Sequence, residues 1–335
     1  MAMRMDFPSS RARCLFLARA DPLANRPAPS HLLKTGAICR EGSMNDSEAV
    51  FCPMPERAVL RVAGAEARVF LQGLVSADVT RLTPGASLWG AFLTPQGRYL
   101  HDFFLVAAGE DVLLETEAAR LPDLAQRLSR YRLRRAVTLD PLDWRVGVVV
   151  GCPSFAALDL QALPGLTRPL PAGGRAFVDP RLAAAGVRLL LAPGDAPPPG
   201  LGTGTAADWH AQRLSLGLPD GAADLEVEKA LLLENGFEEL GGVSFTKGCY
   251  LGQEMTARTH YRGLIRRRLV PVVVEGPLPA PGTLVQDEAG EEVGVVRSGQ
   301  GEVALAFLRL EALERPLWAG VARVTPRVPA WMKSE

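Results

Sequence analysis

The residues of this chain that can do the most chemistry form one run, Lys247-Gly248-Cys249-Tyr250-Leu251-Gly252-Gln253-Glu254. Cys249 is a nucleophile, and Lys247 brings a cation within two residues of it. Residues 249–259 contain no proline and several good helix formers, which places Cys249 in the first turn of an expected helix. The unpaired N–H groups of that turn and the lysine cation would both stabilise a thiolate. We therefore expect Cys249 to react faster with iodoacetamide than the other cysteines of the folded core.

Two glycines belong to the same expected helix. Gly248 and Gly252 are four residues apart, so both would lie on one helix face. Glycine costs about 1 kcal/mol relative to alanine inside a helix. Close approach of a ligand or of another stretch of backbone would justify that cost. The alternative is structural: a buried cysteine, with glycines that allow tight helix packing.

Positive charge follows this run. Arg258 stands four residues after Glu254, the order that favours a salt bridge within a helix. A basic stretch continues to the next expected strand and consists of Arg258, His260, Arg262, Arg266, Arg267 and Arg268. It either neutralises a polyanionic group such as phosphate or polyglutamate, or it is a solvated connector, which we favour for 266–268. No regular interleaving with aromatic residues suggests base stacking, so nucleic-acid binding is not predicted.

The pair His101-Asp102 is a second candidate. It follows Gly97 closely and falls inside an apolar strand expected over 99–106. A carboxylate there is costly unless it is paired or bound to a ligand. Asp102 either accepts hydrogen bonds from the N–H groups of a ligand or forms an internal pair with an arginine. The four histidines of the chain have no mutual metal-binding spacing, so no metal site is expected.

The elements that must position these residues alternate without a regular strand–helix–strand repeat, which is typical of an α+β fold. Strands are expected at 59–62, 87–94, 99–106, 111–116, 144–150 and 187–191, and helices at 64–74, 121–131 and 206–216. The helix at 121–131 leads into a basic cluster formed by Arg127, Arg130, Arg132, Arg134 and Arg135. Beyond residue 268, five short strands separated by glycine or proline turns predict a small antiparallel barrel.

Shifts of composition divide the chain into four expected parts. They are a leader at 1–43, a first α+β lobe at 44–150, a second α+β lobe at 151–265 that carries the cysteine, and a barrel at 266–335. The leader holds six arginines but lacks the apolar stretch of a secretory signal. We favour translation from Met44, with a mitochondrial transit peptide as the alternative.

Composition narrows the functional classes. Lys plus Arg and Asp plus Glu number 37 each, so no net field draws the protein to nucleic acid or to an acidic membrane. No apolar run approaches the roughly 18 residues that a membrane span needs. The five cysteines form no C-x-x-C pair, which favours free thiols in a reducing compartment; we expect the cytoplasm, or the mitochondrial matrix if the leader is a transit peptide.

From about Val59 to Trp331 the chain resembles the YgfZ-type folate-binding proteins, which are relatives of the glycine-cleavage aminomethyltransferase. The resemblance rests first on the K-G-C-Y-L-G-Q-E run and on Thr256-Ala257-Arg258. Matches to the wider superfamily fall in the same order along the chain; they are Gly64-x-x-Ala67-x-x-Phe70-Leu71-Gln72, Thr94-Pro95-Gln96-Gly97-Arg98, Asp102, Leu128-x-x-Tyr131-x-Leu133-Arg134-x-x-Val137 and Trp209-x-x-x-Arg213-x-x-x-Gly217-x-Pro219.

The resemblance implies a three-lobed ring of two α+β lobes and a C-terminal antiparallel β-barrel, with tetrahydrofolate bound in a central hole. It also implies a role in assembling or repairing iron–sulfur clusters in client enzymes, including radical enzymes that modify tRNA. In that scheme Cys249 lines the folate site and Lys247 activates it. Further folate contacts are implied for Gly248, Tyr250, Gly252, Gln253, Glu254, Arg258, Asp102 and Arg98. Among these, Asp102 would receive the N–H edge of the pterin.

Three functions remain open. The first is a folate-binding accessory factor for iron–sulfur proteins, which need not be an enzyme. The second is a one-carbon transferase that acts on an aminomethyl carrier; His101 departs from the double aspartate of the transferase, and the transferase lacks the cysteine run. The third is a non-catalytic scaffold whose exposed cysteine docks an assembly partner. The expected partners are reduced folate and iron–sulfur client or assembly proteins, with neither nucleic acid nor a membrane.

Overall fold

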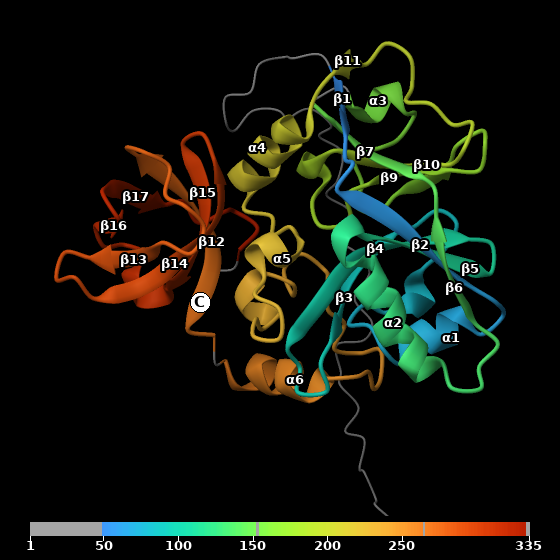
Figure 1. Cartoon of the computed structure of the whole chain (residues 1–335), viewed down its shortest axis with the longest axis horizontal. Coiled ribbons are helices and arrows are strands. Elements are labelled where there is room, and N and C mark those ends of the chain that lie inside the picture. The colour runs from blue at the N-terminus through green and yellow to red at the C-terminus, as the bar shows by residue number, and fades with distance from the viewer. Residues whose placement is uncertain (1–48, 152–153, 264, 333–335) are drawn as a thin grey trace, which may run out of the picture. The chain divides into compact units, whose positions relative to one another are not determined.

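The computed structural model describes residues 49–151, 154–263 and 265–332. The expected leader at 1–43 lies outside these ranges. The described part of the chain forms two sheets and a closed barrel, with short helices around them (Figure 1). The expected class, α+β with a C-terminal antiparallel barrel, is confirmed.

The first sheet consists of β2 (Arg57–Ala63), β3 (Leu88–Leu93), β4 (Tyr99–Ala108), β5 (Asp111–Glu117) and β6 (Thr138–Leu142). Its strands are antiparallel in the order β3-β4-β5-β2-β6. Two helices pack on it, α1 (Ala67–Gln72) and α2 (Leu121–Arg132). Leu121, Leu124 and Leu128 are buried on one face of α2, as the apolar spacing predicts.

The second sheet consists of β1 (Val50–Pro53), β7 (Arg145–Val150), β8 (Thr167–Pro169), β9 (Arg175–Val178), β10 (Val187–Leu191) and β11 (Gly202–Thr203). The order is β11-β1-β7-β10-β9-β8, and β11 runs parallel to β1. Two of these strands, β1 and β7, precede residue 150. The chain thus enters the second sheet, crosses to the first at Arg57 and returns at Arg145, so sheet membership does not follow chain order.

The barrel consists of β12 (Arg267–Glu275), β13 (Leu284–Asp287), β14 (Glu292–Gln300), β15 (Val303–Arg309), β16 (Leu317–Ala319) and β17 (Ala322–Pro326). It closes in the order β12-β15-β14-β13-β16-β17, with β17 paired back onto β12. The sequence indicated five strands; β16 was missed because three residues are too few to show a period-two pattern.

The remaining helices connect these layers. They are α3 (Ser154–Ala157), α4 (Ala206–Leu216), α5 (Gly221–Asp224) and α6 (Gln253–Arg262), with 3-10 turns at Val79–Arg81, Ala118–Arg120, Ala183–Ala185, Leu233–Asn235 and Leu310–Ala312. A capping box of Thr205 and Asp208 starts α4, and Gly217 ends it in a left-handed conformation. This helix touches the barrel strands β14 and β15 as well as β1 and β7 of the second sheet (Figure 1).

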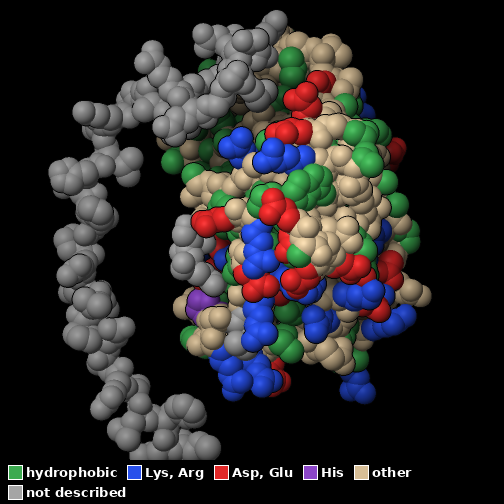
Figure 2. All heavy atoms as spheres, turned by 90° about the vertical axis from the view of Figure 1, so that its left-hand side faces the viewer, with side chains coloured by type: hydrophobic (Ala, Val, Ile, Leu, Met, Phe, Trp, Pro, Cys, Tyr) green, Lys and Arg blue, Asp and Glu red, His purple; other side chains and the backbone are tan. Residues whose placement is uncertain are grey.

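Buried charges join the two sheets. Glu115 on β5 accepts hydrogen bonds from Arg57 Nε at 2.9 Å and from Arg188 Nη1 on β10 at 2.6 Å. Arg188 Nε in turn lies 3.2 Å from Asp179 Oδ2. These side chains are almost completely buried, so each charge depends on its neighbours for compensation. On the face that Figure 2 shows, acidic and basic side chains are interspersed, apart from a group of basic ones at its lower end.

Candidate functional site

The cysteine run is a loop that leads into a helix. The helix α6 begins at Gln253, whereas Gly248 and Gly252 have φ angles of +88° and +78°. Two left-handed residues interrupt any helical path, so the expectation that Cys249 lies in the first helical turn is wrong. The expectation that the two glycines share a helix face is wrong for the same reason.

Cys249 is exposed on this loop. The structural alternative, a cysteine buried in packed hydrocarbon, is therefore wrong for this residue. Cys52 on β1 fits that description instead: it is 0% exposed, and burial raises the pKa of its thiol to about 11. Of the two cysteines that the structure describes, Cys249 is the one that a partner can reach.

Close approach of a second backbone explains Gly252. A Cβ atom at this position would stand 2.3 Å from the carbonyl oxygen of Thr94. Likewise, a Cβ atom on Gly97 would stand 2.6 Å from the carbonyl oxygen of Gly252. The turn at 94–97 and the cysteine loop therefore lie in direct backbone contact. Gly248 has nothing within 4 Å of such an atom and borders open space.

Lys247 fastens the loop to the segment that follows α1. Its Nζ donates to the carbonyl oxygens of Val75 at 2.6 Å and Ala77 at 2.5 Å. The ammonium also lies 5.1 Å from the centre of the Tyr250 ring. Burial lowers the pKa of Lys247 to about 8. The contacts of this cation are thus with backbone oxygens and an aromatic face.

Gln253 fixes the other end of the loop. Its Oε1 accepts a hydrogen bond from the backbone N–H of Tyr250 at 3.1 Å. Tyr250 is 8% exposed, and burial raises the pKa of its hydroxyl to about 12. Glu254 and Arg258 are both exposed and form no ion pair with each other in the part of the chain that the structure describes. The salt bridge expected from their spacing is therefore absent.

The basic stretch after the loop has acidic partners that the sequence did not suggest. The His260 ring stacks on Phe245 with centroids 3.9 Å apart, and its Nδ1 lies 3.0 Å from Glu238 Oε2. Arg268 is 3% exposed and donates to Glu239 Oε1 at 2.7 Å. The prediction of a solvated connector is wrong for Arg268, because this guanidinium is anchored in the interior.

Asp102 is buried and engaged by side chains of its own sheet. Its Oδ1 accepts from the Tyr99 hydroxyl at 2.8 Å and its Oδ2 from Trp89 Nε1 at 3.1 Å, and the residue is 3% exposed. The predicted internal pair with an arginine is wrong: among the described residues Asp102 forms no ion pair within 4.0 Å. Sequence reasoning missed Trp89 and Tyr99, since nothing local distinguishes them from other aromatic strand residues. Trp89 also stacks on Phe237, with centroids 3.9 Å apart.

His101 and Arg98 also have protein partners. His101 Nε2 lies 2.8 Å from Asp123 Oδ2, while Nδ1 is buried without a partner. Burial, together with the nearby Arg120 cation, lowers the pKa of His101 to about 4. The Arg98 guanidinium donates to the carbonyl oxygen of Lys229 at 2.8 Å.

Tetrahydrofolate fits this arrangement only in part. Two of the segments assigned to it, the turn at 94–97 and the cysteine loop, do meet at Gly252. The two side chains differ in access, because Asp102 is buried with both oxygens engaged whereas Cys249 is exposed. A pterin therefore does not fit Asp102 as this residue is arranged here.

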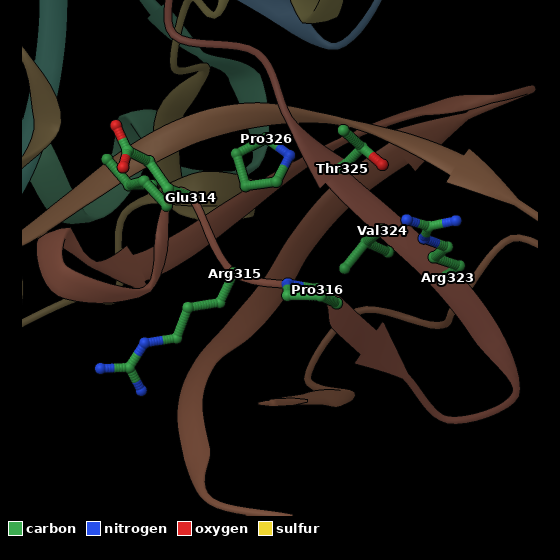
Figure 3. A pocket seen from close by; sticks show the side chains of 8 residues that line it. Glu314, Arg315, Pro316, Arg323, Val324, Thr325 and Pro326 are labelled. Carbon is green, nitrogen blue, oxygen red and sulfur yellow. The ribbon is translucent and has the colours of Figure 1, made fainter. Parts of the chain in front are cut away.

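Other features of the described residues stand apart from the loop. The barrel carries a hollow of about 310 Å³, where Arg315 extends away from the other labelled side chains and pairs with Asp287 at 3.0 Å (Figure 3). It contains none of the predicted site residues. No group of three or more His, Cys, Asp or Glu side chains among the described residues could hold a metal ion. Within the same ranges, each helix is too short or too polar to span a membrane.

Comparison with known proteins gives one family model and several relatives. The model described as the C-terminal beta-barrel domain of CAF17 matches residues 266–334. A mouse (Mus musculus) protein named iron-sulfur cluster assembly factor IBA57, mitochondrial, is 38% identical over 332 residues, covering 90% of this chain and 91% of the relative. The human (Homo sapiens) protein of the same name is 39% identical over 282 residues, 78% of each chain. A homologue from Mycosarcoma maydis is 31% identical, covering 92% of this chain and 88% of its own.

Among solved structures, the chain is similar to aminomethyltransferase T of the glycine cleavage system from Bartonella henselae. The TM-score is 0.71 at 15% identity, covering 85% of this chain and 87% of the other. This likeness confirms the aminomethyltransferase-like fold expected from the sequence. At such low identity it shows the fold alone.

Proposed function

The chain belongs to the family of iron–sulfur cluster assembly factors that includes IBA57, and from this premise we propose that it assists cluster assembly or repair in client proteins through Cys249. The observation that carries the proposal is the exposed thiol on a loop held at both ends. Lys247 ties one end to the backbone after α1, and Gln253 ties the other to the start of α6.

One thiolate cannot hold a cluster alone, because iron–sulfur clusters take several cysteine ligands. No second cysteine or histidine completes such a set among the described residues. We propose that, if Cys249 contacts a cluster, a partner protein supplies the remaining ligands. The site therefore supports action at an interface with an assembly or client protein rather than catalysis on a small molecule.

Replacement of the cysteine tests the proposal. We expect Cys249→Ser to lose client maturation in cells depleted of the native protein, measured as cluster-dependent enzyme activity. The exposed side chain makes little packing, so the melting temperature should stay within about 2 °C of the unchanged protein. A Cys249→Ser protein that is folded and restores clients in full would contradict the proposal.

The range of clients is a finer proposal. The resemblance to YgfZ-type proteins suggests radical enzymes that modify tRNA. Modified nucleosides in tRNA, measured by mass spectrometry in the same depleted cells, should fall and recover only with the unchanged chain. Normal levels of modified nucleosides in depleted cells would show that the tRNA-modifying enzymes are not clients.

Reduced folate is a second candidate ligand, supported by the resemblance and by the contact of the 94–97 turn with the cysteine loop at Gly252. Binding that engaged Asp102 would have to displace Trp89 or Tyr99. We therefore expect tetrahydrofolate to produce heat in a calorimetric titration. In a parallel titration, we expect it to change the tryptophan fluorescence, to which Trp89 contributes. A titration without heat would exclude folate as a ligand and would not affect the proposed role of Cys249.

A one-carbon transferase remains the alternative activity. Its support is the fold and the order of superfamily motifs, whereas His101 bonded to Asp123 departs from the transferase pattern. Formation of methylene-tetrahydrofolate from a loaded lipoyl carrier would establish this activity. We expect no product.

The compartment is also a proposal. The relatives carry the word mitochondrial in their names, which favours the mitochondrial alternative over the expected cytoplasm. Mass spectrometry of the native N-terminus, together with fractionation of the source cells, would decide between translation from Met44 and a cleaved leader.

A further inference from the structure

The loop after α2 exposes an apolar side chain at an unusual backbone position. Leu133 is 86% exposed and has a φ angle of +51°. Positive φ disfavours leucine, whose Cβ atom clashes with the backbone there, and such strain gathers at functional positions. A leucine that is both strained and solvated gains nothing from packing in this chain. The exposed fraction and the strain together indicate that the side chain of Leu133 serves contact with another molecule rather than stability of the fold.

The frame around Leu133 is fixed. Glu66, the residue before α1, accepts a hydrogen bond from the backbone N–H of Ala136 at 2.9 Å and lies 3.4 Å from Arg135 Nη1. Gly64 packs so closely beneath the loop that a Cβ atom would stand 2.2 Å from the carbonyl oxygen of Ala136. The leucine is therefore presented by a loop of defined shape.

Arginines surround it. The basic tip, as we call residues 130–135, contains Arg130, Arg132, Arg134 and Arg135, all exposed. Arg130 and Arg134 have no hydrogen-bond or ion-pair partner among the residues that the structure describes. A surface hollow of about 580 Å³ borders the tip, lined by Arg132 to Thr138 together with Ala63 and Gly64. Two unpaired cations, Arg130 and Arg134, thus lie close to the exposed Leu133 in the chain, and Arg134 lines the hollow together with it.

We propose that the basic tip is a docking surface for an acidic protein that receives Leu133 in an apolar recess. An apolar anchor ringed by charge is the usual anatomy of a specific protein interface. Opposite charge on the partner would speed association and set the orientation. Nucleic acid or free phosphate would account for the arginines but not for the exposed leucine between them. The tip also has no exposed aromatic ring on which bases could stack.

The tip and the cysteine loop are linked through one short helix. Glu66 at the start of α1 holds the tip, whereas Gly73 just after its end accepts a hydrogen bond from Leu251 N at 3.1 Å. Gln72 also donates to the carbonyl oxygen of Lys247 at 3.3 Å. Six helical residues span roughly 9 Å, and a standard interface covers about 800 Å² on each partner. One partner is large enough to reach both sites, and that step alone rests on the proposed function.

A photo-cross-linker tests which molecules meet the tip. The full-length protein carries p-benzoylphenylalanine in place of Leu133 or, as a control, in place of Val321, which is also 86% exposed but lies in the barrel. We expect a discrete adduct with an acidic protein from position 133 only. An adduct with nucleic acid, the same adducts from both positions, or none at all would overturn the proposal.

The captured protein is then purified and titrated against variants. Leu133→Gly suits the positive φ and should keep or raise the melting temperature, so loss of binding reports the side chain itself. We expect Leu133→Gly and Arg134→Glu each to weaken affinity at least tenfold. We also expect the affinity of the unchanged protein to fall as the salt concentration is raised from about 50 to about 300 mM. Arg323→Glu, at an exposed barrel arginine, is the matched control and should bind normally. Unchanged binding by both tip variants would overturn the proposal.

Failure of the docking proposal and failure of the proposed function are separable. If the tip docks the partner, Cys249→Ser should still bind it while client maturation is lost. If Cys249→Ser matures clients normally while the tip variants lose binding, the role of the cysteine falls and the docking surface stands.

Discussion

At the scale of single residues, exposure separates the two cysteines that the structure describes. Cys249 lies on an open loop, whereas burial raises the pKa of Cys52 to about 11 and closes it to reagents. At neutral pH we expect iodoacetamide to modify Cys249 in the folded protein and to leave Cys52 unmodified until urea is added. Peptide mapping by mass spectrometry reads both sites in one sample. Equal labelling of both cysteines in the folded state would contradict this reading.

His101 makes stability depend on pH. Its folded pKa of about 4 lies below the usual 6.5, so between these values the unfolded chain binds a proton that the folded protein does not. This contribution to stability is present above pH 6.5 and is lost as pH falls toward 4. From pH 7 to pH 5 the loss amounts to about 2 kcal/mol, measured by urea unfolding.

The control for this prediction is His101→Gln, which keeps a donor toward Asp123 but does not titrate. We expect its free energy of unfolding to fall less than that of the unchanged protein over the same interval. Parallel pH profiles for the two proteins would show that other groups cause the loss. Burial of the ring, whose Nδ1 has no hydrogen-bond partner among the described residues, and the nearby Arg120 cation both disfavour the second proton.

At the scale of elements, the contact between the 94–97 turn and the cysteine loop sets the position of Cys249. Gly252→Ala would push a methyl group against the Thr94 carbonyl oxygen, 2.3 Å away, in a backbone conformation that disfavours alanine. We expect a loss of more than about 2 kcal/mol in the free energy of unfolding, from overpacking and strain together.

Gly248→Ala separates these two causes. Gly248 also has a positive φ, but nothing lies within 4 Å of a Cβ atom there. This variant should cost only about 1 kcal/mol, the conformational part alone. Denaturant unfolding of both proteins gives the difference, which reports the packing of turn against loop. Equal losses would mean that this packing contributes nothing.

At the scale of the whole described unit, buried charges connect parts that are distant in the chain. Glu115 in the first sheet binds Arg57 and also Arg188 in the second sheet. Arg213 on α4 extends the connection toward the barrel, with Asp224 at 2.7 Å and Ser298 Oγ at 3.1 Å. Removing one member of such a set leaves a buried charge without full compensation.

We expect Glu115→Gln to lower the free energy of unfolding by about 3 kcal/mol or more. Asp140→Asn is the matched control, because its ion pair with Arg61 lies at the surface with both side chains about 40% exposed. That change should cost less than about 1 kcal/mol. Urea unfolding at one pH compares the two. A small loss at Glu115 would show that the sheets are held together by apolar packing alone.

Patterns that are local in sequence were predictable. The strand at 187–191 and the helix at 206–216 agree with β10 and α4 to the residue, since apolar spacing and the glycine stop at Gly217 are properties of the chain itself. The exposure of Cys249 was foreseen only as one of two alternatives, because no neighbour in the sequence reveals what covers a side chain.

Where prediction failed, a distant part of the chain was responsible. Good helix formers predicted a first helical turn at Cys249, yet Gly252 lies against the 94–97 turn in a left-handed conformation, and α6 begins only at Gln253. Asp102 was expected to meet a ligand or an arginine. Its partners Trp89 and Tyr99 come from neighbouring positions of a folded sheet, and only strand pairing brings the indole to that carboxylate.

The amino-acid sequence by itself determined the α+β class, the barrel and the family signature around Cys249, because periodicity, turn residues and a rare motif are written in consecutive positions. Tertiary structure decided that the Cys249 thiol is exposed while the Asp102 carboxylate is buried, and that Leu133 is exposed with a positive φ near two unpaired arginines, Arg130 and Arg134. Burial, backbone clash and charge pairing depend on residues that are distant in the chain, such as Lys247 and Val75, which are 172 positions apart. These interactions therefore exist only once the chain has folded.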